Sequence, residues 1–120
     1  MDTEGKYILR GKTAVPCSDL MAWADWIGTA RMNRVVCQTK TANGYFVSTV
    51  FLGLDHGYGQ CPPILFETMV FSQKKYPSKL FGKTMRMRKD YEQKRYSTWW
   101  EAEEGHKRTV RRVMRWVKRS

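Results

Sequence analysis

Residues 34–52, RVVCQTKTANGYFVSTVFL, decide the fold. Two runs of β-branched and aromatic residues, 34–41 and 45–52, flank the dipeptide Asn43-Gly44. Because Asn-Gly tolerates the positive φ angles of a type I′ turn, this stretch predicts a β-hairpin. Both faces of the second run are largely apolar, which predicts a central strand covered on both sides.

The sheet extends beyond this hairpin in both directions along the chain. A loop rich in glycine and proline, 53–63, separates the hairpin from a third strand at 64–71, ILFETMVF. Short strands are also predicted at 6–10 and, as an edge strand, at 91–96. Pro16 is read as a stop for regular structure after the first of these. The sequence therefore predicts an antiparallel sheet of three to five strands.

Two segments with helical spacing predict helices that pack on this sheet. Apolar residues recur every three or four positions in 19–29, and Ser18 offers an N-cap. Thr98 and Glu101 fit a capping box, after which a long amphipathic pattern predicts a helix over 99–118. We therefore expect a single α+β domain spanning the 120-residue chain, with the longer of two helices at the C-terminal end.

Charge is divided unevenly along the chain. The sequence holds 22 Lys and Arg against 11 Asp and Glu, a formal net charge of +11. Residues 1–73 carry six basic and six acidic side chains, whereas 74–120 carry sixteen basic and five acidic ones. The net charge thus lies in the C-terminal third. This indicates a polyanionic partner such as nucleic acid, a nucleotide, an anionic membrane surface or an acidic protein.

Composition also limits the compartment and the chemistry. No apolar run approaches the roughly 18 residues of a membrane span, and the first residues are charged, which favours a soluble protein that is not exported. The three cysteines are odd in number and form no chelating pair with each other or with a histidine. They predict a reducing compartment without a disulfide framework, and no metal site or cofactor.

The first candidate site is a row of basic side chains on the predicted C-terminal helix. Spacings of three and four residues place most of them on a stripe about 16 Å long, which matches several consecutive phosphates of one strand. Arginine predominates, and its guanidinium suits bidentate contact with phosphate. A solvated surface, a protein partner or an amphipathic helix on an anionic membrane are the alternatives. The candidate residues are Arg108, Arg111, Arg112, Arg115, Lys118 and Arg119.

The second candidate site is the basic segment 74–96, predicted as a long loop or arm. Cations interleaved with aromatic residues are typical of binding to single strands or nucleotides, where rings stack on bases. The same aromatic residues would equally anchor an arm to its own core. The basic candidates are Lys74, Lys75, Arg86, Arg88 and Lys89, and the stacking candidates are Tyr76, Phe81 and Tyr91.

The loop 53–63 contains the one arrangement that suggests catalysis. Asp55 and His56 could act as an orienting carboxylate and a general base, with Glu67 and His106 as further candidates. Adjacent residues rarely point the same way, and no second motif accompanies the pair. Structural hydrogen bonding in the loop is the favoured interpretation, and no catalytic residue is predicted.

Three strings carry a resemblance: STVFLGLDH at 48–56, PILFETMVF at 63–71 and RYSTWWEAEEGH at 95–106. Together they resemble a family of small proteins encoded by tailed bacteriophages and prophages, over most of residues 7–110. The resemblance implies a phage gene product expressed in the cytoplasm of the bacterial host, and it carries no catalytic residues to transfer.

The chain departs from this family at the two places that supply its net charge. The segment between Phe71 and Arg95 is longer and more basic, and the helix after His106 is extended and cationic. The function predicted from the sequence is therefore a non-enzymatic phage accessory protein that binds nucleic acid or another phosphate-rich ligand through its C-terminal third. The alternative is an inhibitor that blocks a host defence protein, or a protein that sequesters a signalling nucleotide.

Overall fold

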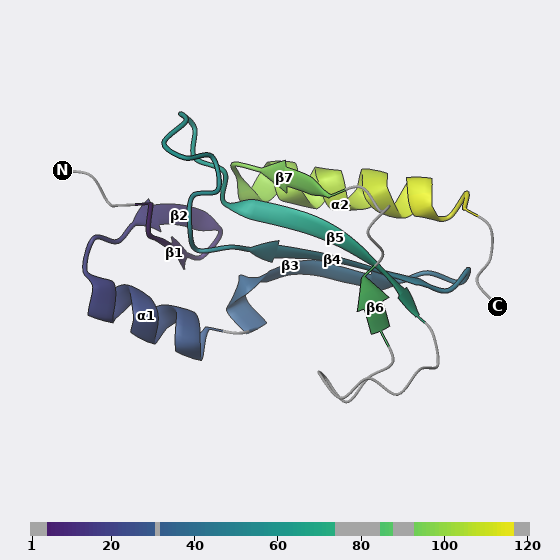
Figure 1. Ribbon diagram of the computed structural model, residues 1–120, viewed down its shortest axis with the longest axis horizontal. Coiled ribbons are helices and arrows are strands. Elements are labelled where there is room, and N and C mark those ends of the chain that lie inside the picture. Colours follow the sequence, from purple (N-terminus) through teal and green to yellow (C-terminus); the bar gives the residue numbers. More distant parts are fainter. Residues whose placement is uncertain (1–4, 31, 74–84, 88–92, 117–120) are drawn as a thin grey trace.

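The computed structural model describes residues 5–30, 32–73, 85–87 and 93–116. This part of the chain has an α+β fold with two α-helices, the longer one C-terminal, which confirms the predicted class (Figure 1). In chain order the elements are β1 (Tyr7–Arg10), β2 (Thr13–Pro16), α1 (Leu20–Thr29), a 3₁₀ turn η1 (Met32–Arg34), β3 (Val35–Lys40), β4 (Tyr45–Phe51), β5 (Phe66–Gln73), β6 (Met85–Met87), β7 (Lys94–Tyr96) and α2 (Trp99–Val113).

The main sheet is antiparallel and is built around β5. Strands β3, β4 and β5 are adjacent, and β6 and β7 both pair with β5. β7 pairs with the first residues of β5, at Phe66–Thr68, and β6 with its last ones, at Phe71–Gln73. The predicted hairpin, third strand and edge strand are therefore confirmed.

The N-terminal strand forms a sheet of its own. β1 pairs with β2, a strand that was not predicted because Pro16 was read as a stop for regular structure. Pro16 is instead the last residue of β2, where a missing N–H is tolerated. The hairpin is fastened to the main sheet by the Tyr7 N–H, which donates to the Gly53 carbonyl at 2.9 Å.

The turn between β3 and β4 differs from the predicted type I′ turn. Gly44 has a φ of 96°, but Asn43 does not have a positive φ, and the Gly44 N–H donates to the Thr41 carbonyl at 3.2 Å. The loop that joins β3 to β4 is therefore longer than two residues. The Asn43 amide explains the difference, because its Nδ2 donates to the Val113 carbonyl at 2.7 Å and so caps the end of α2.

The two faces of β4 are covered unequally. Tyr45, Val47, Thr49 and Phe51 are buried, and they alternate with half-buried residues. The buried face lies under α2, which crosses the sheet with its Ala102, His106, Thr109 and Val113 turned inward (Figure 1). The prediction that both faces are covered is therefore right only for the face under α2.

Helix α1 packs at the end of the sheet through half-buried side chains, and none of its residues is fully buried. The Trp23 indole donates to the Gly53 carbonyl at 3.0 Å, and the ring edge of Trp26 meets Phe51 with centroids 5.8 Å apart. Asp19, not the predicted Ser18, is the N-cap, since its carboxylate accepts from two backbone N–H groups of the first turn.

A polar network runs through the layer between α2 and the sheet. The His106 ring is 2% exposed, and its two nitrogens lie 2.8 Å from the Thr39 hydroxyl and 2.7 Å from the Thr49 hydroxyl. Thr49 in turn lies 2.5 Å from the hydroxyl of Thr68. A neutral imidazole, with one N–H and one lone pair, satisfies both contacts. Burial lowers the pKa of His106 below its ordinary value of 6.5 and so favours this neutral form.

Gly105 allows α2 to approach β7. A Cβ at this position would overlap the ring of Tyr96, whereas a Cβ at Gly28 of α1 would meet nothing within 4 Å. The glycine in the middle of α2, unfavourable for helix formation, is therefore required by packing.

The two helical glycines should respond in opposite ways to alanine. We expect Gly105→Ala to lower the free energy of unfolding by about 1 to 3 kcal/mol, because the methyl group displaces Tyr96. Gly28→Ala is the matched control and should raise it by about 0.5 to 1 kcal/mol through helix propensity. Urea denaturation measures both, and a stabilised Gly105→Ala variant would show that the helix has room to move away from β7.

Protonation of His106 should destabilise the fold. Because its pKa is lowered in the folded chain, the unfolded chain binds the proton more readily. This contribution to stability is therefore fully present above the ordinary pKa of 6.5 and is lost as the pH falls below that value and through the lowered pKa of the folded chain. His106→Gln should reduce this loss, whereas His56→Gln, at an exposed position, should leave it unchanged. If the free energy of unfolding depended on pH equally in both variants, the loss could not be assigned to His106.

Candidate nucleic-acid interface

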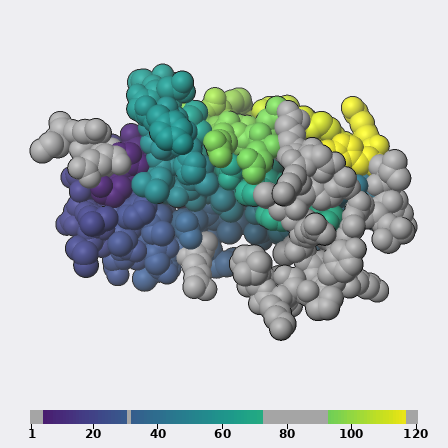
Figure 2. Space-filling view, viewed as in Figure 1, coloured from purple at the N-terminus to yellow at the C-terminus, as the bar shows by residue number. Residues whose placement is uncertain are grey.

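The outward side of α2 is cationic over its last turns. Arg108, Arg111 and Arg115 are exposed, and Arg112 is half-buried with its Nη2 3.5 Å from the Thr109 hydroxyl. From Arg108 to Arg112 the axial distance is about 6 Å, which corresponds to about two phosphates of one DNA strand, and Arg115 lies in the turn that follows the helix. The C-terminal part of α2 reaches the surface in the space-filling view, in yellow (Figure 2).

The predicted boundaries of this helix are correct at the start and wrong at the end. The capping box is present, since Thr98 accepts from the Glu101 N–H and Glu101 accepts from the Thr98 N–H. The helix ends at Val113 rather than at 118, because Asn43 caps its terminal carbonyls. Lys118 and Arg119, two of the predicted contacts, lie outside the described residues.

Trp116, three residues beyond the helix, packs on the sheet. Its ring edge meets Tyr45 with centroids 5.0 Å apart. A tryptophan engaged in this way is not presented to a membrane interface, which weakens the amphipathic-membrane interpretation of the C-terminal segment.

Three of the arginines have no counter-charge in the described part of the chain. No carboxylate there pairs with Arg108, Arg111 or Arg115. The neighbouring Lys107 differs, because its Nζ lies 3.2 Å from Glu104. The arginine charges therefore remain available for an external anion. We call Arg108, Arg111, Arg112 and Arg115 the arginine face.

The packing of α2 shows which way part of this face points. Gly105 abuts Tyr96 of β7, so this side of α2 is directed towards β7. Arg108 and Arg112 follow Gly105 by three and seven residues, which places them on the same side of the helix. Arg108 and Arg112 thus lie along the edge of α2 that is nearest to β7.

Strand β7 supplies a further cation that the sequence analysis did not identify. Lys94 stands opposite the buried Thr68, on the face of the sheet that α2 covers. Arg95 stands opposite Glu67 on the other face, and its Nε lies 2.9 Å from the Glu67 carboxylate. Lys94 was missed because alternation along β7 is visible only once its register with β5 is known.

The second predicted site lies almost entirely outside the described residues. Arg86 is in β6, at the register position opposite Ser72. The remaining predicted residues of the arm lie outside the part of the chain that is described: Lys74, Lys75, Tyr76, Phe81, Arg88, Lys89 and Tyr91.

In the Asp55-His56 pair, the Asp55 carboxylate is hydrogen-bonded to the backbone of its own loop. The Asp55 carboxylate accepts from the backbone N–H groups of Gly57, Gly59 and Ile64 at 2.7, 3.3 and 2.9 Å. Burial opposes the negative charge, but these hydrogen bonds and the neighbouring His56 outweigh it, so the pKa of Asp55 lies below its ordinary value of 3.8. These hydrogen bonds hold the loop, and no hydrogen bond is found between the Asp55 carboxylate and the exposed His56 ring, both of which lie in the described part of the chain.

The other two candidates for this pair are engaged elsewhere. Glu67 is in the ion pair with Arg95, and both ring nitrogens of His106 contact threonine hydroxyls. Within the described residues, no three His, Cys, Asp or Glu side chains cluster closely enough to hold a metal ion. The three cysteines are free thiols, and neither helix in these ranges is long and apolar enough to cross a membrane.

Comparison with protein-family models, with curated proteins and with solved structures finds no match to this chain. The resemblance to small phage proteins therefore stays a prediction, and the function has to be argued from the site.

Proposed function

We propose that this protein binds nucleic acid, or another phosphate-rich ligand, through the arginine face of α2. The observation that carries the proposal is the absence of any carboxylate partner for Arg108, Arg111 and Arg115 within the described ranges. Such clustered like charges repel one another in the free protein, and a row of phosphates relieves that repulsion.

The chemistry of the side chains favours phosphate over a carboxylate-rich protein surface. Guanidinium groups make paired hydrogen bonds to phosphate oxygens, and their spacing along α2 suits a repeating anion. Contacts of this kind position a strand without reading its sequence, because base-specific recognition needs groups directed at base edges. The proposed activity is therefore binding with little sequence preference. With the resemblance to small phage proteins, the proposal is a non-enzymatic phage accessory protein that acts in the cytoplasm of a bacterial host.

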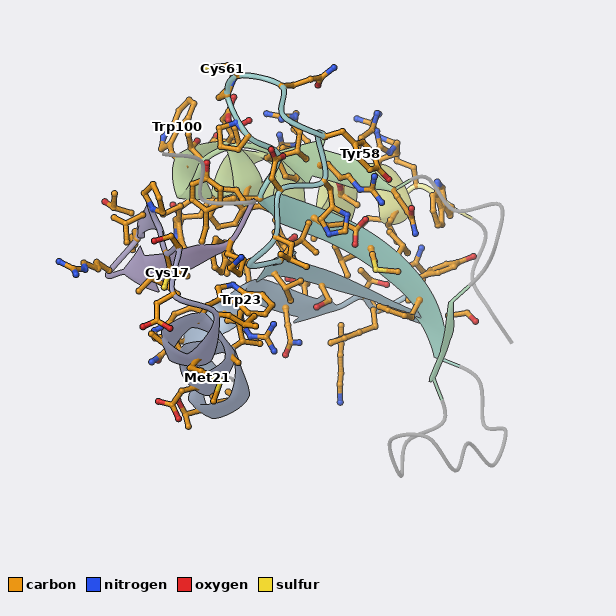
Figure 3. The ribbon with its side chains drawn as sticks, turned by 60° about the vertical axis from the view of Figure 1, so that its left-hand side comes forward. Cys17, Met21, Trp23, Tyr58, Cys61 and Trp100 are labelled. Atoms are coloured by element: carbon orange, nitrogen blue, oxygen red, sulfur yellow. The ribbon has the colours of Figure 1, made fainter. Side chains whose placement is uncertain are left out.

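A second candidate function is favoured by exposed apolar side chains far from α2's last turns. Leu20 and Met21 on α1 are 60% and 76% exposed, and Tyr58 and Trp100 are exposed as well. Figure 3 shows Met21 pointing away from the molecule, while Trp23 of the same helix points towards the sheet. Exposed apolar groups of this kind suit a protein partner, for example a host defence protein that the chain blocks.

Salt dependence tests the proposed function directly. Fluorescence anisotropy with a labelled duplex should show affinity falling steeply as salt rises, since counterions are released from the phosphates. We expect the triple variant Arg108→Ala, Arg111→Ala, Arg115→Ala to bind about 10- to 100-fold more weakly at about 0.1 M salt. The slope of log K against log salt should fall by about 2 to 3, at about 0.9 for each lost contact.

A triple variant that removes the same charge elsewhere is the control. Arg10→Ala, Lys40→Ala, Lys107→Ala loses three exposed cations outside the arginine face and should reduce affinity only slightly. Equal losses of affinity in both triple variants would show that the net charge of the protein, and not the arginine face, determines binding. Binding unaffected by salt would contradict the proposal, and a host protein retained after exhaustive nuclease treatment would favour the second candidate.

A further inference from the structure

A cavity of about 440 Å³ lies where the β1–β2 hairpin, α1, η1, β3 and the start of α2 meet. Its volume falls within the range of small-molecule sites. Trp26 and Trp99 line it together with Asn33, Gly11 and Met32. None of these residues belongs to the arginine face, which occupies the other end of α2.

The two indoles that line the cavity are held by rings of the core. The Trp26 ring meets Phe51 edge-on, with centroids 5.8 Å apart and planes at 85°. The Trp99 ring meets Phe66 in the same way, at 6.2 Å and 84°. Aromatic walls that are fixed before binding lose little conformational entropy when a planar ligand enters.

One buried hydrogen-bond donor on the wall of this cavity has no acceptor. Among the described residues, nothing accepts from Nε1 of Trp99, which lines the cavity. A buried donor without a partner costs about 1 to 3 kcal/mol, so each such group in a folded protein needs an explanation. A ligand with acceptor atoms would provide one.

A cation lies against one aromatic wall of the cavity. The Lys12 Nζ lies 5.8 Å from the centroid of the Trp99 ring. The hairpin, residues 7–16, contains no carboxylate side chain. An anionic group on the ligand would therefore find a cation next to this wall.

We propose that this cavity binds a single nucleotide. The indoles of Trp26 and Trp99 provide apolar surface for the base, and the Asn33 amide offers the donor and acceptor pair that base edges match. The free donor of Trp99 meets an acceptor of the ligand, and Lys12 meets its phosphate. The site goes beyond the proposed binding at the arginine face and does not depend on it.

Isothermal titration calorimetry with AMP, GMP, CMP and UMP tests the proposal on the intact protein. We expect at least one of them to bind saturably, with a Kd of about 10 μM to 1 mM, and the matching nucleoside to bind more weakly. The corresponding dinucleotide distinguishes the sources of the ligand: tighter binding than the mononucleotide indicates the end of a strand, and weaker binding a free nucleotide.

Trp99→Phe should weaken nucleotide binding about five- to tenfold, because it keeps an aromatic wall and removes the indole donor. Trp100→Phe, at an exposed neighbouring position, should have no effect. Asn33→Ala, also exposed, changes a lining residue without disturbing the core and should weaken binding by a similar factor. The triple arginine variant should bind the nucleotide normally, which separates this proposal from the proposed function.

Two results would overturn the inference. One is the absence of saturable heat with all four nucleotides up to about 10 mM. The other is binding that Trp99→Phe, Asn33→Ala and Trp100→Phe leave equally unchanged, since the ligand would then occupy another part of the surface.

Discussion

His106 connects α2 to the sheet, and the rest of the surface depends on this connection. Its imidazole lies on the inward side of α2 and contacts hydroxyls of β3 and β4, with Thr68 of β5 joined through Thr49. Directional contacts to fixed partners set the rotation of the helix about its axis more closely than apolar packing does. Because His106 and Val113 face the sheet, the arginines between and beyond them have to lie at the edge of α2 or on its solvent side. The cationic surface is therefore a consequence of a buried neutral side chain.

Elements that depend on neighbouring residues were predictable from the sequence. The hairpin of β3 and β4, the strand β5 and the capping box of α2 each follow from a local pattern, and each is present. The features that were missed depend on contacts between distant residues. Asn43 was read as a turn residue, but its amide caps α2 seventy residues later, which changes both the turn and the end of the helix. No local pattern contains that information.

The candidate sites also divide into those that a local pattern predicts and those that depend on contacts between distant residues. Helical spacing alone was enough to propose Arg108 and Arg111, because the period of a helix determines which residues share a side, whereas Arg115 lies beyond the end of α2. Lys94 needed the register of β7. The cavity needed five elements to assemble, so its residues are scattered from the β1–β2 hairpin to the start of α2. Its one sequence signal, a set of tryptophans in a small basic protein, is equally typical of a core.

Both proposed sites contain polar or charged groups without a favourable partner in the described part of the chain, and such groups lower the free energy of unfolding. Arg108, Arg111 and Arg115 hold like charges close together without carboxylate partners in the described part, although Lys107 shows that α2 can pair a cation with a glutamate of its own. At the cavity, the indole N–H of Trp99 is buried without an acceptor among the described residues. A sequence that specifies its fold through caps, a buried polar network and a matched glycine is otherwise locally consistent. Local conflict in such a protein supports the proposal that these two surfaces are functional, and their chemistry is complementary. The proposed interface would offer positive charge to a row of phosphates, and the proposed nucleotide site would offer aromatic walls and a free donor to a single base.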